Sequence, residues 1–381
     1  MRLLQVIDSL APGGAERSLV ATAPYLLQAD IELSVAVLHE RPGLQAELTT
    51  TGTRLLVGGD GSRRENLKWL RRTLEESRPD LVHTTLFEAD VLGRIAARSR
   101  RIPVVSSFVN TSYGEEHRQD PGVGTTSLRA ARALDMITAR VVRRFHAVSY
   151  AVADTMSQRL RVPRDRVDVV WRGRDRRALG ERTEKRRRAA RARFDVDDET
   201  RVLVMLSRHE ADKGIDVAIS AVERALPNVD SARLLVAGRT GNATTRLRDQ
   251  IAAAGLEHVV TLLGPRDDTA ELLCAGDVFL APSRREGLPG AVLEAMALEI
   301  PVVGSDIPSV LEAVGDEANA LLVPVGDAGG LAAAIVDTLR DPRTARARAA
   351  RARARFDACF TVERSAHAMI DFYRRALEEP R

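Results

Sequence analysis

Short apolar runs alternate with amphipathic stretches along most of the chain. Runs such as 234–237 and 278–281 are apolar at consecutive positions, which predicts strands buried on both faces of a sheet. The stretches between such runs carry apolar residues three or four positions apart, and this spacing predicts helices. Strands that alternate with helices are typical of parallel sheets joined by crossover helices. We therefore predict an α/β protein.

The predicted strands form two groups with a polar, basic stretch between them. We predict an N-terminal Rossmann-like domain over 1–172, a basic interdomain linker over 173–193 and a C-terminal Rossmann-like domain over 194–360. The segment 361–381 should hold a last helix, since its apolar residues fall on one face. A polar stretch at 122–126 predicts a loop or a mobile lid. The first group of strands is expected at 3–8, 33–38, 54–57, 81–85, 104–108, 146–149 and 167–171, and the second at 202–207, 234–237, 259–263, 278–281, 302–305 and 321–325.

The junction after the strand at 278–281 is the most informative stretch of the chain. A charged turn containing Gly287 leads through Pro289 to Gly290 and a predicted helix. Glycines let a ligand come close to the backbone, and free amides at a helix start attract phosphate. The junction therefore predicts a site for a phosphorylated ligand.

Two glutamates flank this predicted phosphate site. Glu286 lies in the turn, and Glu294 lies about one and a half turns into the helix, at roughly 1.5 Å per residue. A carboxylate accepts hydrogen bonds from a pair of sugar hydroxyls, so the two glutamates suit a ligand with a diphosphate between two sugar rings. Spacing alone is weak evidence, because Glu32 and Glu40 share it. An ordinary strand-turn-helix with solvated glutamates is the alternative.

The whole stretch from this strand to Asp306 resembles the retaining nucleotide-sugar glycosyltransferases of family 4. The resemblance implies the GT-B architecture, in which two Rossmann-like domains with parallel sheets face each other across a cleft. It further implies that the last helix crosses back to the N-terminal domain. In such a site Glu286 would hold the donor sugar and Glu294 the ribose, and the donor would also contact Gly287, Leu288 and Gly290.

In each predicted domain, one further loop of interest follows the first strand. Gly13 and Gly14 open a helix and are similar to the family 4 loop that lies against the donor phosphates. Arg208 and Lys213 follow the strand at 202–207 and look like the family's Gly-Arg…Lys-Gly element. A guanidinium fork and a flexible ammonium suit the charge of a leaving diphosphate without a metal ion. A tight turn and two exposed cations are the alternatives.

The remaining candidates are less specific. Gly264 and Arg266 end a predicted strand where the family's nucleotide base packs. Gly238 follows another predicted strand and is expected either to allow close approach of the backbone under the cleft or simply to mark a loop. Asn110 follows Val109 where many family members place a histidine near the reacting sugar. The Asn110 amide can donate a hydrogen bond but cannot accept a proton at neutral pH, so the donor sugar and the acceptor are not defined by the resemblance.

Composition and charge narrow the class of protein. The chain has 381 residues, 4% of them aromatic, which suits two domains of helices packed on sheets. A formal charge of +4 hides arginine clusters at 172–193 and 340–355, which we interpret as solvated faces because no aromatic residues interleave with them as in nucleic-acid sites. Attraction of these clusters to anionic lipid is the alternative.

The sequence also bears on the cellular location of the protein. The two cysteines, the lack of a signal peptide and the lack of a membrane-length apolar run predict a cytoplasmic protein, either soluble or peripheral to the inner face of the membrane.

Neither a metal nor a resident cofactor is predicted. Asp195 and Asp197 imitate a metal-binding Asp-x-Asp, but they lie in a polar turn, and the dinucleotide fingerprint Gly-x-Gly-x-x-Gly is absent. We predict a metal-independent retaining glycosyltransferase that moves a sugar from a nucleoside-diphosphate sugar to an alcohol acceptor on a glycan, a lipid-linked sugar or a small glycoside. The alternatives are a nucleotide-sugar epimerase of similar architecture and a non-catalytic module that binds a nucleotide or an anionic surface.

Overall fold

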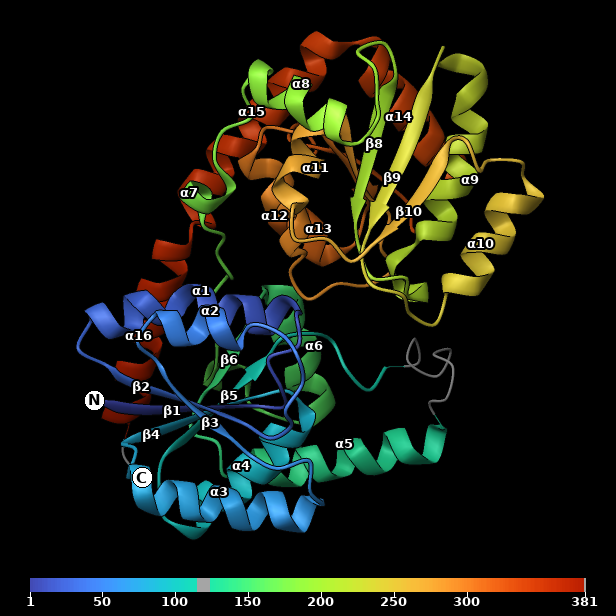
Figure 1. The fold of residues 1–381 in the computed structure, drawn as a ribbon. Coiled ribbons are helices and arrows are strands. Elements are labelled where there is room, and N and C mark those ends of the chain that lie inside the picture. The colour runs from blue at the N-terminus through green and yellow to red at the C-terminus, as the bar shows by residue number, and fades with distance from the viewer. Residues whose placement is uncertain (115–123, 380–381) are drawn as a thin grey trace. The chain divides into compact units, whose positions relative to one another are not determined.

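The computed structural model describes residues 1–114 and 124–379 (Figure 1). The chain divides into two compact units, one made of Met1–Arg174 with Thr361–Arg381 and the other of Asp175–Phe360. We call them the N-terminal unit and the C-terminal unit. Each contains a parallel sheet flanked by helices, which confirms the predicted α/β class and the two Rossmann-like domains. Residues 122–123 of the predicted loop lie outside the described residues.

The sheet of the N-terminal unit has the order β3-β2-β1-β4-β5-β6-β7 among the described residues. The direction of this order reverses between β1 and β4, and such a reversal marks where open α/β sheets bind ligands. β1 pairs in parallel with β2 on one side and β4 on the other. The strands are β1 Arg2–Ile7, β2 Glu32–Val37, β3 Arg54–Val57, β4 Leu81–Thr85, β5 Val104–Phe108, β6 Phe145–Ala147 and β7 Val167–Val169.

Helices cover both faces of this sheet. The first and last helices of the chain, α1 and α16, contact each other on one face, whereas α3, α4 and α5 lie on the other (Figure 1). Ile370, Phe372 and Tyr373 of α16 are buried in the same core as the strands, so the end of the chain belongs to the N-terminal unit. The helices are α1 Gly14–Gln28, α2 Gln45–Thr50, α3 Arg63–Ser77, α4 Phe87–Ser99, α5 Thr125–Ala139, α6 Tyr150–Leu160 and α16 Val362–Glu378.

The sheet of the C-terminal unit has the order β10-β9-β8-β11-β12-β13 in the part of the chain that is described. Its order reverses between β8 and β11, and α9 and α14 pack together over one face. The strands are β8 Arg201–Leu206, β9 Ala232–Ala237, β10 Val260–Gly264, β11 Val278–Ala281, β12 Val302–Ser305 and β13 Leu321–Val323. The helices are α7 Arg176–Leu179, α8 Glu184–Arg193, α9 Ile215–Ala225, α10 Thr244–Ala253, α11 Thr269–Ala275, α12 Gly290–Ala297, α13 Pro308–Val314, α14 Ala328–Arg340 and α15 Pro342–Cys359.

Each predicted strand has a counterpart in the structure, and the differences are at the ends. β6 ends at Ala147, before the predicted end at Ser149, because the Ser149 hydroxyl caps α6 by accepting from the amide of Val152. β7 ends at Val169, before the predicted end at 171, although the amide of Val170 still donates to the carbonyl of Ala147. Within the described residues no helix is long and apolar enough to cross a bilayer.

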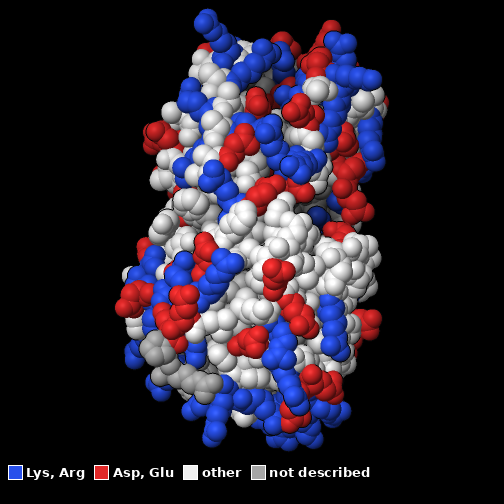
Figure 2. Space-filling view, turned by 90° about the vertical axis from the view of Figure 1, so that its left-hand side faces the viewer, with Lys and Arg blue, Asp and Glu red and all other residues white. Residues whose placement is uncertain are grey.

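The two basic clusters contain exposed arginines, such as Arg188, as well as arginines that serve the structure of the C-terminal unit, so their interpretation as solvated faces holds for only part of each cluster. Arg191 on α8 is 1% exposed and its guanidinium lies 3.3 Å from the Asp277 carboxylate. Arg186 pairs with Glu271 at 2.8 Å. Figure 2 shows basic and acidic side chains interspersed over the visible face of this unit. The local charge is therefore balanced by neighbours rather than left for a large anionic partner.

Candidate functional site

The loops after β8 and β11 meet at the switch point of the C-terminal unit, since these strands are neighbours in the sheet. Gly214, in the first loop, has a φ of +66°, and a Cβ there would overlap the carbonyl oxygen of Pro282 in the second loop. The amide of Arg284 donates to the carbonyl of Asp212 at 2.7 Å. Position 214 therefore requires glycine, and the two loops hold each other in place.

These loops place two predicted site residues in one ion pair. The Lys213 ammonium lies 2.9 Å from Oε1 of Glu286, and the Ser283 hydroxyl donates to the same oxygen at 3.0 Å. The Lys213 side chain is only 14% exposed, so the pair is partly shielded from water. Among the described residues both contacts go to Oε1, which leaves Oε2 of Glu286 for a ligand. The arrangement offers a cation and a hydrogen-bond acceptor at one point.

A second layer of charges supports this pair. Asp212 lies 3.6 Å from the Lys213 ammonium and 3.6 Å from the Arg285 guanidinium. Burial raises the pKa of Asp216, but hydrogen bonds from Arg284 at 2.9 and 2.8 Å outweigh it and hold that pKa below its usual value. Asp216 therefore stays ionised at neutral pH.

Arg208 adds a second cation just after the end of β8. Its side chain is exposed and makes no hydrogen bond or ion pair with any residue in the described ranges. A guanidinium in this state is available to an anion, because binding would not require it to leave a carboxylate. Arg208 thus differs from Lys213, whose ammonium must be shared with Glu286.

The remaining residues that we predict to contact the sugar donor lie in the loop after β11 and at the start of α12. The helix begins at Gly290 after Pro289, and no side chain caps its first turn. Leu288 is buried at 1% exposure and anchors the turn, whereas Glu294 lies half-buried one turn into the helix. An uncapped helix start presents backbone amides and the positive end of the helix dipole, which suits a phosphate.

Gly238, predicted to allow close approach under the cleft, follows β9, whereas Gly264 and Arg266, predicted near the nucleotide base, lie at the end of β10 and just after it. A Cβ at Gly238 would overlap the carbonyl oxygen of Ser207, so glycine permits close contact with the β8 loop. Gly264 has a φ of +71° and its carbonyl accepts from the amide of Gly238 at 2.9 Å. Arg266 is bound to Asp268 at 2.6 and 2.7 Å, which raises the Arg266 pKa, and lies 5.0 Å from the Phe194 ring. Its contacts are with those two residues rather than with the Lys213 pair.

The other predicted site residues belong to the N-terminal unit. Gly13 and Gly14 begin α1 without a side-chain cap, and a Cβ at Gly14 would overlap the guanidinium of Arg172. Asn110 follows β5, is exposed, and its Oδ1 accepts from the amide of Thr111 at 2.9 Å. The Asn110 amide nitrogen can still act as a hydrogen-bond donor.

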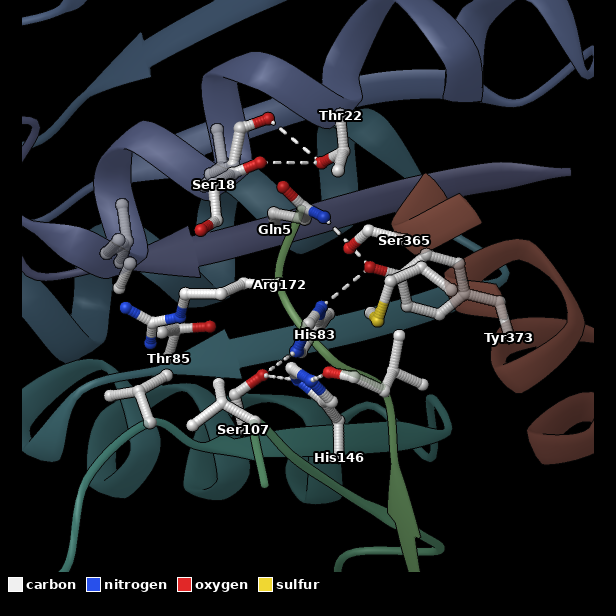
Figure 3. A pocket seen from close by; sticks show the side chains of 17 residues that line it. Gln5, Ser18, Thr22, His83, Thr85, Ser107, His146, Arg172, Ser365 and Tyr373 are labelled. Carbon is white, nitrogen blue, oxygen red and sulfur yellow. Dashed lines mark hydrogen bonds between the residues drawn. The ribbon is translucent and has the colours of Figure 1, made fainter. Parts of the chain in front are cut away.

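Sequence reasoning missed a hydrogen-bonded chain beneath this edge (Figure 3). The chain lines a cavity of about 70 Å³ between the sheet, α1 and α16. Burial lowers the pKa of His83 to about 3 and that of His146 to about 4, so both imidazoles are neutral. The links are Gln5 Nε2 to Tyr373 Oη at 2.9 Å, Tyr373 Oη to His83 Nδ1 at 2.8 Å, His83 Nε2 to Ser107 Oγ at 2.7 Å, Ser107 Oγ to His146 Nδ1 at 2.7 Å and His146 Nε2 to Val170 O at 2.9 Å.

A half-buried carboxyl at the switch point of the N-terminal unit was also missed. Asp8 follows β1, accepts from the amide of Ala89 at 2.7 Å, and burial raises its pKa to about 6. Leu86, which precedes α4, has a φ of +79°, a conformation that costs a non-glycine residue energy. The sequence signal available for Asp8 was its place directly after the first strand.

No group of three or more His, Cys, Asp or Glu residues is placed to hold a metal ion in the ranges that the structure covers. Asp197 of the Asp-x-Asp segment instead accepts from the amides of Glu199 and Thr200 at 3.1 and 2.7 Å. Hydrogen bonds from Thr200 lower the pKa of Asp197. This segment forms a capped turn.

Two family models match the chain. The model for Glycosyltransferase Family 4 matches residues 12–177, and the model for Glycosyl transferases group 1 matches residues 186–355. The matches fall on the N-terminal and C-terminal units in turn and together span most of both. The loops built around Gly13 and around Lys213 each lie inside a matched range.

Similar proteins have been described in other organisms. The α-D-kanosaminyltransferase of Streptomyces kanamyceticus is 25% identical over 357 residues, which are 88% of this chain and 89% of the relative. The D-inositol 3-phosphate glycosyltransferase of Mycobacterium tuberculosis (strain F11) is 33% identical over 203 residues, 51% of this chain and 41% of that protein. Among solved structures, Anabaena Alr3699/HepE in complex with UDP-glucose has a TM-score of 0.87 at 23% identity, covering 98% of this chain and 100% of that one. WaaG, a glycosyltransferase involved in lipopolysaccharide biosynthesis, has a TM-score of 0.78 at 17% identity, covering 97% and 99%.

Proposed function

Because the chain belongs to the family 4 glycosyltransferases and is an enzyme that transfers sugars, we propose that its donor is a nucleoside-diphosphate sugar and that transfer to an alcohol retains the anomeric configuration. The fold is GT-B, as in its structural neighbours. Retention rests on the family 4 resemblance. The donor class also has support from the charges at the switch point of the C-terminal unit.

The Lys213–Glu286 pair is the observation that carries this proposal. In the free protein the Lys213 ammonium binds the Glu286 carboxylate at 2.9 Å. A bound donor would place phosphate oxygens beside Lys213 and sugar hydroxyls beside Glu286, so each partner would exchange one charge-assisted hydrogen bond for another. The ammonium then stabilises negative charge as the diphosphate leaves.

Arg208 and the start of α12 would share the diphosphate with Lys213. The Arg208 side chain is exposed, and the first turn of α12 has no side-chain cap, so both can accept an anion. Glu294 would accept from the ribose hydroxyls. With two cations and a helix start around the leaving group, we expect turnover without a metal ion or other resident cofactor.

The predicted contacts in the N-terminal unit define the acceptor less closely than those in the C-terminal unit define the donor. Asn110 would donate a hydrogen bond to the reacting sugar, and Gly13 and Gly14 would present backbone amides to the donor phosphates. The acceptor would be a glycan, a lipid-linked sugar or a small glycoside, reached from the cytoplasm or at the inner face of a membrane. Neither Cys274 nor Cys359 forms a disulfide, which suits a reducing compartment.

A binding screen and a product analysis test this proposal. Because an Anabaena neighbour was solved with UDP-glucose, UDP and its sugars come first, followed by GDP, ADP and TDP. One nucleoside diphosphate should raise the melting temperature, and Lys213→Ala should reduce that rise. NMR of the transferred sugar should show the donor's anomeric configuration. The proposal fails if none of these nucleotides binds, or if the product is inverted.

A further inference from the structure

The cavity in the N-terminal unit extends from the interior to the ligand edge of the sheet. At its inner end lie Gln5 and Tyr373, and toward the edge lies Arg172, which follows β7 (Figure 3). Val109, which follows β5, also lines the cavity. Leu19 of α1 gives part of its apolar wall. A volume of about 70 Å³ has room for several water-sized atoms.

The direction of every hydrogen bond in the chain along this cavity is fixed from one end. The Val170 carbonyl can only accept, so a neutral His146 carries its proton on Nε2 and accepts at Nδ1. The Ser107 hydroxyl must then donate to His146 and accept from Nε2–H of His83. His83 Nδ1 is consequently an acceptor, and the Tyr373 hydroxyl donates to it.

The orientation of the Gln5 amide follows from this order. Since the Tyr373 proton is already used on His83, Tyr373 can only accept from Gln5, and Gln5 must present Nε2 to it. Reversing the amide would reverse each link and set two lone pairs against each other at the Val170 carbonyl. The Gln5 oxygen Oε1 must therefore point away from Tyr373, and Figure 3 shows it directed toward α1.

Gln5 Oε1 is a buried acceptor that lacks a donor. The side chain is 6% exposed, and Oε1 has no hydrogen-bond partner within the described part of the chain. A buried acceptor left unsatisfied costs free energy, and the donor that relieves it must enter the cavity. The charged group at the cavity, Arg172, lies against Gly14, and Figure 3 shows its guanidinium directed away from Gln5.

We infer that this cavity is a subsite for a short, neutral, mostly apolar group that ends in an O–H or N–H donor bonded to Gln5 Oε1. The cavity reaches the edge that holds Asn110, so, if the proposed function holds, the group belongs to the acceptor. A group without a donor would leave Gln5 Oε1 unsatisfied, because the protons of His83, His146 and Tyr373 are already used within the chain. Water fills the subsite when no ligand is bound.

Three small molecules with the same heavy-atom skeleton test the chemistry. Crystals of the full chain are soaked in equal concentrations of propan-2-ol, acetone or acetate, and solution affinities are measured by ligand-observed NMR. Propan-2-ol should bind with its oxygen within hydrogen-bond distance of Gln5 Oε1, at least about tenfold more tightly than the other two, since a site built for a donor discriminates against analogues that lack one. The inference is overturned if acetone or acetate binds equally well, or if the cavity holds only water in all three soaks.

Three variants keep the test independent of folding effects. Gln5→Met preserves volume and should abolish the preference for propan-2-ol, whereas Gln158→Met, at an exposed position on α6, should retain it. Thr22→Leu should fill the cavity from α1 and exclude propan-2-ol while Gln5 is intact. A preference that survives in Gln5→Met overturns the inference.

Turnover separates this inference from the proposed function. With an active donor and acceptor pair, Gln5→Met should alter the KM of the acceptor and leave that of the donor unchanged. A changed donor KM alone overturns the assignment to the acceptor. Because the soaks need no turnover, selective propan-2-ol binding by a protein that binds no nucleotide would sink the proposed function and leave the subsite standing.

Discussion

The two sheets present opposite chemistries at equivalent edges. At the switch point of the C-terminal unit, Lys213, Glu286 and Asp212 form a cluster of ionised groups held by ion pairs between two loops. Beneath the ligand edge of the N-terminal unit, His83 and His146 are neutral and joined by hydroxyl groups in a buried chain. The comparison suggests that the charged side chains that recognise the donor lie in the C-terminal unit, whereas the buried chain of the N-terminal unit recognises a neutral group.

The largest effect is expected from the cations of the C-terminal unit. If Arg208 and Lys213 both meet the diphosphate, each contributes roughly 1.5 to 3 kcal/mol, so Arg208→Ala and Lys213→Ala should each lower kcat/KM by at least about tenfold. Because both act on one group, the double variant should lose less than the product of the single losses. Steady-state kinetics with unchanged melting temperatures would establish this.

The matched control is Arg188→Ala on α8. The Arg188 side chain is 67% exposed and pairs with Glu184 at 3.1 Å, so its loss should leave kcat/KM nearly unchanged. If Arg188→Ala cripples transfer while both loop variants remain active, the charged site has been placed at the wrong end of the C-terminal unit.

The buried chain of the N-terminal unit should matter for stability rather than for donor binding. Tyr373→Phe removes the donor to His83 Nδ1 and the acceptor of Gln5 Nε2, and two orphaned buried groups should cost about 2 to 4 kcal/mol of unfolding free energy. Chemical denaturation measures this directly. Tyr150→Phe, at a side chain that is 54% exposed, serves as the control and should change stability by less than about 0.5 kcal/mol. Equal losses of unfolding free energy in the two variants would mean that the hydroxyl in the buried chain contributes no more to stability than an exposed one.

The neutral histidines also predict a pH dependence. Their folded pKa values, about 3 for His83 and about 4 for His146, lie below the ordinary value near 6.5, so the unfolded chain takes up protons first as the pH falls. Their contribution to stability is present above about pH 6.5 and declines as the pH falls toward about 4. In His83→Gln, the unfolding free energy should fall less steeply over this range. Burial also raises the pKa of Asp8, and this shift changes stability with pH in the opposite sense. Asp8 is present in both the wild type and His83→Gln, so its effect cancels in the comparison. Parallel pH profiles would contradict the neutral chain.

The smallest expected effect is that of chelation. If Arg208 and Lys213 neutralise the leaving diphosphate, EDTA should leave the initial rate of transfer unchanged. Complete loss of turnover that magnesium or manganese restores would remove the reason for assigning both cations to the diphosphate.

The sequence predicted the fold and the charged site far better than the buried chain, for physical reasons. Strands such as β11 are buried on both faces and leave contiguous apolar runs. The residues around Lys213 and Glu286 lie in short loops next to such strands, so local motifs reveal them. Strand ends were less certain because helix caps such as Ser149 compete with the ladder.

The buried chain could not be assembled in the same way. Gln5 and Tyr373 lie at opposite ends of the sequence and meet only because α16 packs in the N-terminal unit. A signal was present, since Gln5 interrupts the apolar run of β1 and His83 is buried in β4, and a polar residue buried in a strand needs a partner. The sequence did not show which partner.

Calorimetric titration of UDP, or of whichever nucleoside diphosphate the screen selects, tests the division between the units most directly. Glu294→Ala should weaken binding by roughly tenfold through loss of the ribose acceptor, whereas Glu286→Ala should leave affinity for the free nucleotide nearly unchanged because the sugar is absent. Gln5→Met, in the N-terminal unit, should bind the nucleotide like the wild type. Equal losses in both glutamate variants, or a loss in Gln5→Met as large as that in Glu294→Ala, would contradict the account.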